Sequence, residues 1–200
     1  EALLAGRDAA KAGDKAKLER LAPEFAGDEL AVYLDYWRLL PDLKETDPLV
    51  VQNFLQRNEG SYIAEKMRGD WLRVLGKQQR WSEFEREYAA LQQPDQDLAC
   101  YALQRRLAQG DSGALDEAMP LWLGLTDTPE ACYPVLEALI VSKRVLADDV
   151  WARVRRQVEA NRLAGARYSM NYLPPSQTPD AKTALAVTES PLQWLVKLPP

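Results

Sequence analysis

A helical-hairpin repeat constrains the fold of this chain more strongly than any other feature of its sequence. The segment from Gly110 to Trp122 repeats the pattern of the segment from Gly13 to Phe25, with glycine, aspartate, leucine, proline and an aromatic residue at matching places. The spacing between the two copies is close to three periods in the low thirties, which is typical of paired-helix arrays. In such arrays each hairpin buries its apolar face only by stacking on its neighbours. We therefore predict an all-α fold, a right-handed superhelix (α-solenoid) of paired antiparallel helices.

A third copy of the pattern begins at Gly76 and is weaker, because aromatic residues stand where the first copy has leucine. Turns are accordingly expected at residues 13, 76 and 110, with a further turn near residue 44, in the segment 43–46. Chance similarity in a chain rich in alanine and leucine is the alternative interpretation of the repeat.

Helical periodicity covers nearly the whole chain, whereas the alternation typical of strands is nearly absent. Asp14 is placed to cap one helix, and Asp47-Pro48 reads as the cap and first-turn proline of another. The proline-rich segment 173–179 is expected to be irregular. Helices are predicted at residues 2–12, 15–25, 28–40, 50–58, 61–75, 79–90, 95–109, 113–124, 129–142, 147–160, 162–172 and 179–188, with a short helix at 191–197.

The composition is that of an ordinary globular chain, with 46% hydrophobic and 28% charged residues in a length of 200. A length of 200 allows one or two domains. Because a solenoid grows by adding units, we expect residues 1–200 to form a single α-superhelical domain.

Two sets of aromatic residues recur at helical spacing, so each set falls on one helix face. The favoured interpretation is that both sets belong to the core. A sugar-stacking platform is the alternative, because carbohydrate sites use exposed aromatic rings. The sets are Tyr33, Tyr36 and Trp37, and Trp81, Phe84 and Tyr88.

The net charge of -5 is unevenly distributed, because residues 143–167 contain seven Lys and Arg residues against three acidic ones. An acidic chain with one modest basic stretch is not expected to bind nucleic acid, which needs a dominant positive surface. The stretch is either a solvated helix face, with ion pairs to Asp148, Asp149 and Glu159, or a contact for an anionic ligand or another domain. The candidate contact residues are Arg153, Arg155, Arg156 and Arg162; Arg153 and Arg156 are three apart, which places them on one helix face.

The absence of histidine excludes Ser-His, Cys-His and His-metal arrangements. The glutamates of the segment 83–87 lie near arginines on one amphipathic helix and are most simply a solvated face. The glycine-containing segment 110–113 lacks the lysine of a phosphate-binding loop. We therefore expect no cofactor and no metal, and we assign no catalytic residue.

The two cysteines, Cys100 and Cys132, lie on adjacent predicted helices. They could be a buried free pair in a cytosolic protein or a structural disulfide in an oxidising compartment. No CxxC spacing supports a metal site.

No stretch approaches the roughly 20 apolar residues that cross a bilayer, so no transmembrane segment is expected. The chain starts at Glu1 without a signal peptide of its own. We interpret it as a mature, processed chain or a fragment, and either agrees with export.

Several segments in order carry a family resemblance: Phe25–Trp37, Val51–Leu55, Lys66–Leu72 with Trp81 after it, the cysteine pair, and Asp180–Ala186. Together they resemble the N-terminal superhelical region of periplasmic soluble lytic murein transglycosylases. The resemblance runs through the whole chain. It implies a periplasmic location with the signal peptide removed, and a disulfide between Cys100 and Cys132.

In that family a U of helices closes into a ring with a separate lysozyme-like domain. The catalytic Glu of that domain cleaves the glycan between N-acetylmuramic acid and N-acetylglucosamine and leaves a 1,6-anhydro end. Its motif places Ser after the Glu and a Gly-Leu-Met-Gln segment downstream. Glu189-Ser190 matches only the first half, because Pro191 follows and no such segment appears. Glu189 is therefore not assigned a catalytic role.

The resemblance implies that this chain is a scaffold portion of such an enzyme, inactive by itself, with the catalytic domain absent. Its implied partners are peptidoglycan glycan strands and its own catalytic domain. The alternative function is a self-contained tetratricopeptide-like repeat module that binds other proteins in its groove.

Overall fold

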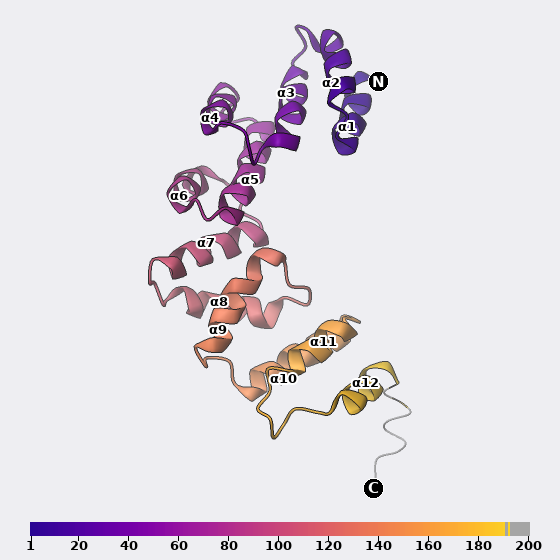
Figure 1. Ribbon diagram of the computed structural model, residues 1–200, viewed down its shortest axis with the longest axis vertical. Helices are drawn as coiled ribbons and strands as arrows, with labels where there is room; N and C mark the ends of the chain where they lie inside the picture. Colours follow the sequence, from indigo (N-terminus) through magenta and orange to yellow (C-terminus); the bar gives the residue numbers. More distant parts are fainter. Residues whose placement is uncertain (191, 193–200) are drawn as a thin grey trace. The chain divides into compact units, whose positions relative to one another are not determined.

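The computed structural model describes residues 1–190 and 192, and every regular element among these residues is an α-helix or a 3-10 helix (Figure 1). The Cα positions group into two compact units, Glu1–Ala99 and Cys100–Pro200. The expectation of a single domain over residues 1–200 stays a prediction.

The first unit contains consecutive helices that pack as neighbours. Helix α1 packs on α2 and on α3, α3 packs on α5, and α5 packs on both α4 and α6. The elements are α1 (Ala2–Ala12), α2 (Lys15–Leu21), η1 (Ala22–Phe25), α3 (Ala31–Leu39), η2 (Leu40–Asp42), α4 (Pro48–Arg57), α5 (Tyr62–Lys77), α6 (Trp81–Ala90) and the start of α7 (Gln96–Ala108).

The core of the first unit contains the predicted aromatic residues. Tyr36, Trp37 and Phe84 are buried, and the Phe84 ring stacks on Tyr88 with centroids 5.3 Å apart. Fully burying a side chain of this size contributes roughly 1.5 to 3 kcal/mol. The interpretation as core is therefore confirmed for Tyr36, Trp37 and Phe84, whereas Tyr33, Trp81 and Tyr88 are half-buried.

Aspartate side chains begin two of these helices as the sequence predicts. The Asp14 carboxylate accepts a 2.9 Å hydrogen bond from the backbone N–H of Lys17, and Asp47 accepts one of 2.9 Å from Leu49. Pro48 stands at the first position of α4, where its missing N–H costs nothing.

The turns that mark the repeat share one hydrogen-bond pattern. Gly13 and Gly110 both adopt a left-handed backbone, with φ of 68° and 81°, and the residue after each donates its N–H to a carbonyl five residues back. The same pattern occurs at Gln79, with φ of 55°, whereas Gly76 lies inside α5. The turn predicted at Gly76 is therefore wrong in position, because a non-glycine residue closes this helix. The turn expected in the segment 43–46 is present.

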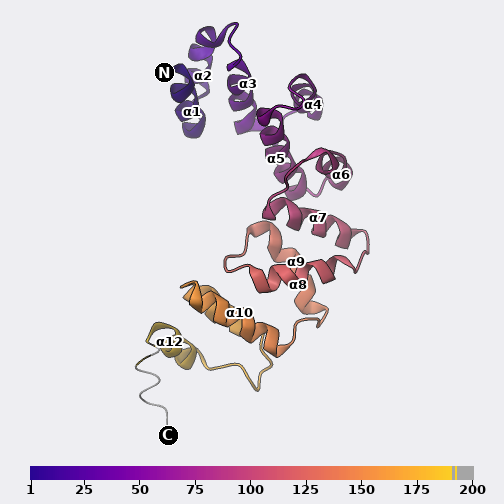
Figure 2. The same ribbon diagram turned by 180° about the vertical axis from the view of Figure 1, so that it is seen from behind.

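The second unit continues from Cys100 in α7 and is seen from the opposite side in Figure 2. Helices α10 and α11 lie side by side; α8 packs on α9 and α10, and α12 packs on α11. The elements are α8 (Ala114–Gly124), η3 (Glu130–Cys132), α9 (Tyr133–Val141), α10 (Ala147–Glu159), α11 (Leu163–Met170) and α12 (Ala181–Glu189).

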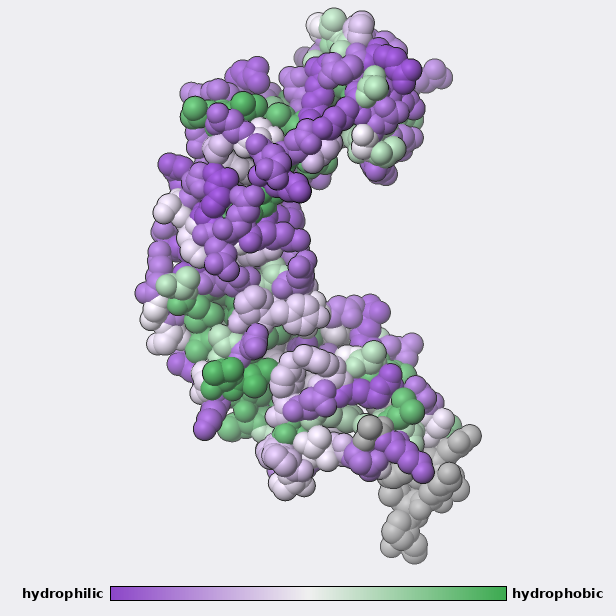
Figure 3. Space-filling view, in the orientation of Figure 1, coloured by the Kyte–Doolittle hydropathy of each residue, from purple (hydrophilic) through white to green (hydrophobic). Residues whose placement is uncertain are grey.

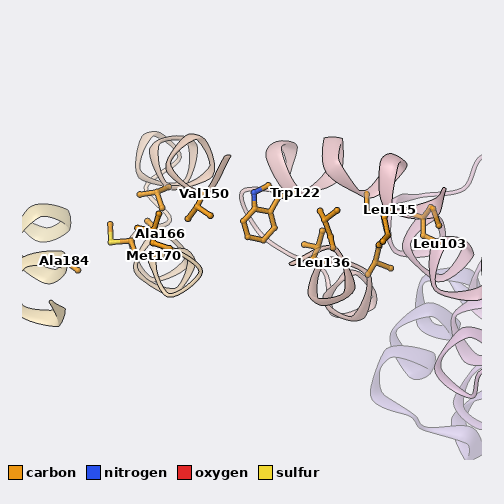
Figure 4. Packing of buried hydrophobic residues seen from close by; sticks show 14 residues of the cluster. Leu103, Leu115, Trp122, Leu136, Val150, Ala166, Met170 and Ala184 are labelled. Atoms are coloured by element: carbon orange, nitrogen blue, oxygen red, sulfur yellow. The ribbon is translucent and has the colours of Figure 1, made fainter. Parts of the chain in front are cut away.

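One cluster of buried side chains forms the core of the second unit. Figure 4 shows members of this cluster from α8, α9, α10 and α11, with Trp122 among them. Trp122 is 1% exposed and is one of the largest fully buried side chains.

Cys100 and Cys132 join α7 to η3, with an S–S distance of 1.94 Å and a Cα–Cα distance of 4.9 Å. Both residues are fully buried. The carbonyl of Ala131 accepts a 2.6 Å hydrogen bond from the Gln104 amide at the same junction. The pairing expected from the resemblance is thus present in the structure.

The predicted helices agree with the observed ones, apart from short 3-10 segments at the ends of some of them. Segment 173–179 is irregular, as expected. The short helix predicted at 191–197 lies outside the described residues, of which only 192 falls within that range. None of the helices in the described part of the chain combines the length and apolar character that crossing a membrane requires.

Candidate functional site

A pocket of about 650 Å³ lies within the second unit. Its walls come from the end of α8 and the following loop, from the start of α9, and from one side each of α10 and α11. Space-filling Figure 3 shows hydrophobic patches among hydrophilic residues on the face of this unit that it displays. The pocket is a candidate site because it gathers a buried charge and several aromatic rings.

Helix α10 brings its polar pocket residues to the inside of the unit. Its start is fixed by Asp149, whose carboxylate accepts a 2.9 Å hydrogen bond from the N–H of Leu146. Val150 and Val154 are buried in the core, and Arg153 and Gln157 are buried beside them, one turn apart. The inward face of α10 therefore carries a cation and an amide together with its valines.

Arg153 is 4% exposed, and its hydrogen-bond acceptors among the described residues are neutral. Its Nε donates to Ser169 Oγ at 3.3 Å, one Nη donates to Thr128 Oγ1 at 2.7 Å, and the other donates to the carbonyl of Trp122. The guanidinium also lies over the Trp122 ring, with Cζ 4.7 Å from a ring centroid. Burial lowers the pKa of Arg153 because removal from water disfavours the charged form.

Gln157 extends this polar network. It accepts a 2.8 Å hydrogen bond from Ser169 Oγ and donates to the carbonyl of Thr126 at 3.3 Å. A Cβ atom at Gly165 would lie 3.0 Å from Gln157 Nε2, so the absence of a side chain there lets α11 approach α10 closely. The network fixes one wall of the pocket.

Tyrosines form the more accessible part of the pocket. Tyr133 and Tyr168 are 54% and 59% exposed. The Tyr168 ring meets Tyr172 edge to face at 5.7 Å, and Tyr172 meets Trp122 at 5.4 Å. Burial, and secondly the hydrogen bond with Tyr168, raise the pKa of Tyr172 far above its usual range. The pocket thus has phenol rings at its mouth and a neutral indole behind them.

Two carboxylates line the pocket, and neither neutralises Arg153. Asp127 forms an ion pair of 2.7 Å with Arg162, and Glu137 is exposed. Among the residues that the structure describes, no carboxylate lies within ion-pair distance of the Arg153 guanidinium.

The structure separates the four arginines that the sequence singled out. Arg153 lines the pocket. Arg162 does not line it but forms an ion pair with Asp127, which does. Arg155 and Arg156 are exposed and do not line it. Arg153 and Arg156 therefore do not form one exposed cationic surface.

The alternative interpretation of the basic stretch predicted ion pairs of these arginines with Asp148, Asp149 and Glu159. No such pair occurs among the described residues. Asp149 instead accepts a hydrogen bond from the backbone at the start of α10.

Sequence reasoning missed the tyrosines and the threonine of the pocket. Tyr168 and Tyr172 are four residues apart, which is a signal for a shared helix face. Thr128 and Tyr133 carry no local signal, because their role follows from how the loop after α8 folds over Arg153.

Two other features of the chain offer less for binding. Glu189 is the exposed last residue of α12, and its carboxylate lies 3.6 Å from Arg167. A pocket of about 510 Å³ in the first unit contains Arg68 and Arg73, but both pair with carboxylates there. Its charges are already matched, so we treat it as structural.

Comparison with known proteins gives matches among solved structures only; no protein-family model and no curated protein matches this chain. One match is the 70-kDa soluble lytic transglycosylase in complex with bulgecin A, and another is the 70-kDa soluble lytic transglycosylase Slt70 from Escherichia coli at 1.65 Å resolution. Each has 18% sequence identity and a TM-score of 0.72, over 96% of this chain and 31% of the solved chain. An inactive mutant of the lytic transglycosylase Slt from Pseudomonas aeruginosa matches with 22% identity and a TM-score of 0.69, over 95% of this chain and 31% of that one.

These likenesses establish the fold. The chain has the all-helical architecture of the superhelical part of soluble lytic transglycosylases. It spans less than a third of the length of the solved chains it matches.

Proposed function

We propose that this chain is the superhelical scaffold portion of a soluble lytic murein transglycosylase. The observation that carries the proposal is the structural likeness to three such enzyme chains over 95% or more of this chain. The ordered series of sequence segments and the Cys100–Cys132 pair support the same assignment.

In this proposal the chemistry lies in a lysozyme-like domain outside this chain. Cleavage of a glycoside needs a carboxyl group that is held in a cleft to protonate the leaving oxygen. Glu189, the only residue with a partial match to the catalytic motif, is exposed beside Arg167. The scaffold would hold the catalytic domain and the glycan strand in a fixed geometry.

The proposed setting is the periplasm, with peptidoglycan as the substrate of the whole enzyme. A buried disulfide agrees with an oxidising compartment. Nucleic acid is not a proposed partner, because the one basic stretch is partly buried and partly paired.

The test is digestion of purified sacculi by the full-length protein from the parent gene and by this chain alone. We expect the full-length protein to release 1,6-anhydro-muropeptides, identified by mass spectrometry, and the chain alone to release none. A full-length protein that binds other proteins but never digests sacculi would instead support the tetratricopeptide-like alternative.

A matched pair of variants of the chain alone checks the assignment of Glu189. Release by the chain that is abolished in Glu189→Gln, but kept in Glu159→Gln at another exposed glutamate, would place catalysis in this chain and contradict the proposal.

A further inference from the structure

We propose that the pocket around Arg153 binds a carboxylate that is carried on a compact body such as a sugar ring. This proposal concerns a binding site of the second unit itself. Only the identity of the carboxylate rests on the proposed function.

The positive charge of Arg153 has no anionic partner among the described residues. A buried cation is costly unless an anion pairs with it. A guanidinium has five N–H donors, and three of those in Arg153 have acceptors, all neutral. In the part of the chain that the structure describes, one N–H on each Nη has no acceptor. A carboxylate from outside would supply both the missing charge and the missing acceptors.

The guanidinium of Arg153 has a donor geometry that suits a carboxylate. Carboxylates pair with arginine in a fork, with two parallel N–H···O bonds. Arg153 is held in place by Ser169, Thr128 and the Trp122 carbonyl, so it does not have to be ordered when a ligand arrives. Preorganised donors cost less side-chain entropy on binding.

Aromatic rings form part of the pocket wall. Tyr133 and Tyr168 are more than half exposed, while Tyr172 and Trp122 lie behind them. Phenol rings combine an apolar face with a hydroxyl that can bond to a ligand. The body of the ligand therefore has C–H faces together with polar groups, as a sugar ring does.

The carboxylates of the pocket limit the charge of its ligand. Asp127 and Glu137 also line the pocket; Asp127 is paired with Arg162, and the two carboxylates oppose a doubly charged ligand more strongly than a singly charged one. The pocket is therefore suited to a monocarboxylate rather than to a phosphate.

On the proposed function, the carboxylate is the lactyl group of N-acetylmuramic acid in glycan without stem peptides, since attachment of a peptide converts this carboxylate into an amide. The other source of the same chemistry is the C-terminal carboxylate of a short peptide. N-acetylglucosamine is the matched control ligand, because it has the same sugar ring without the lactyl carboxylate.

The test is an NMR titration of the isotope-labelled chain with N-acetylmuramic acid, N-acetylglucosamine and D-alanyl-D-alanine. We expect N-acetylmuramic acid to shift pocket resonances with a Kd about tenfold or more below that of N-acetylglucosamine, the difference expected for a charged hydrogen bond. Preference for the dipeptide over N-acetylmuramic acid would keep the carboxylate site and assign it to peptide. Equal affinity for both sugars together with no binding of the dipeptide, or no shift of pocket resonances with either carboxylate, would overturn the proposal.

Arg153→Gln should raise the Kd of the bound carboxylate about tenfold or more, whereas Arg156→Gln, which removes an exposed charge from the same helix, should leave it unchanged. Arg153→Gln also removes structural hydrogen bonds, so Tyr168→Ala provides an independent variant at an exposed position. Tyr168→Ala should raise the Kd about threefold. The control is Tyr62→Ala, because Tyr62 lies in the first unit and is 72% exposed; this variant should leave the Kd unchanged. Unchanged affinity in both pocket variants contradicts the site.

The two proposals fail separately. If the full-length protein releases no muropeptides while the chain still binds the carboxylate through Arg153, the proposed function is wrong and the pocket stands. If muropeptides are released but Arg153 has no effect on binding, the pocket is wrong and the proposed function stands.

Discussion

The phenol of Tyr36 in α3 donates a 2.5 Å hydrogen bond to Oδ2 of Asp70 in α5. Tyr36 is 2% exposed, and Asp70 also lies near Lys66 and Arg73. Burial is the largest cause of a pKa of Tyr36 far above its ordinary value, and the bond to Asp70 adds to it. This bond joins two helices of the first unit across its core.

Replacing Tyr36 by Phe should lower the free energy of unfolding at pH 8 by about 1.5 to 3 kcal/mol, the range for a hydrogen bond to a charged group. The pKa of Tyr36 is raised in the folded state. The phenol therefore makes its full contribution to the free energy of unfolding below a pH of about 10, and this contribution decreases as the pH rises further. Above that pH the unfolded tyrosine loses its proton while the folded one keeps it. The stability gap between the native chain and Tyr36→Phe should therefore narrow above pH of about 10.

Urea unfolding of both proteins, followed by circular dichroism at pH 8 and above pH of about 10, measures this gap. Tyr133→Phe is the control, because Tyr133 is 54% exposed, and it should change stability by less than about 0.5 kcal/mol. A gap for Tyr36→Phe that stays constant across this pH range contradicts the prediction.

Gly6 permits close packing of α1 on α3. A Cβ atom at this position would lie 2.7 Å from the Trp37 ring, which is itself buried. Gly6→Ala should therefore destabilise the chain by about 1 to 3 kcal/mol through overpacking. At Gly124 in α8 a Cβ atom would meet nothing, so Gly124→Ala should be neutral or stabilise by up to about 1 kcal/mol. Thermal unfolding of the two variants should give shifts of opposite sign or clearly different size.

Gly165 should be coupled to Gln157. Gly165→Ala forces the Gln157 amide out of its hydrogen bonds with Ser169 and Thr126, at a cost of about 1 to 3 kcal/mol. In a Gln157→Ala background the obstructing amide is gone, so the same glycine substitution should cost less. A double-mutant cycle by urea unfolding measures the difference. Strict additivity of the two substitutions would show that the close approach has no energetic consequence.

Local chemistry made most of the fold predictable from sequence. Asp14 and Asp47 cap helices because a short carboxylate can reach backbone N–H groups within its own turn. Gly110 closes α7 because glycine adopts a positive φ without strain. The turn at Gln79 was not predicted, because nothing in the sequence indicates that a glutamine adopts a positive φ. The nearby Gly76 suggested a turn at the wrong residue.

The candidate site was predictable only in part, because it depends on tertiary packing. The arginines of the basic stretch were visible in the sequence. Their spacing, however, predicted that Arg153 and Arg156 share one helix face, whereas Arg153 is buried and Arg156 is exposed. Helix α10 packs against both α8 and α11, so its buried face is wide enough to include Arg153 and Gln157. The acceptors of the guanidinium come from α8, the loop after it and α11, and no local pattern connects these segments.

Cys100 and Cys132 should form a disulfide in the native protein, and this disulfide should account for much of the stability of the second unit. It closes a loop with a sequence separation of 32, for which the chain-entropy relation gives about 3 to 4 kcal/mol. Thiol titration of the chain unfolded without reductant should therefore detect no free thiol, and reduction should lower the urea midpoint measured by circular dichroism. The double variant Cys100→Ala with Cys132→Ala is the control, since its midpoint should match that of the reduced chain and should not respond to reductant. Two titratable thiols, or equal midpoints before and after reduction, would show that the bond is absent or contributes nothing to stability.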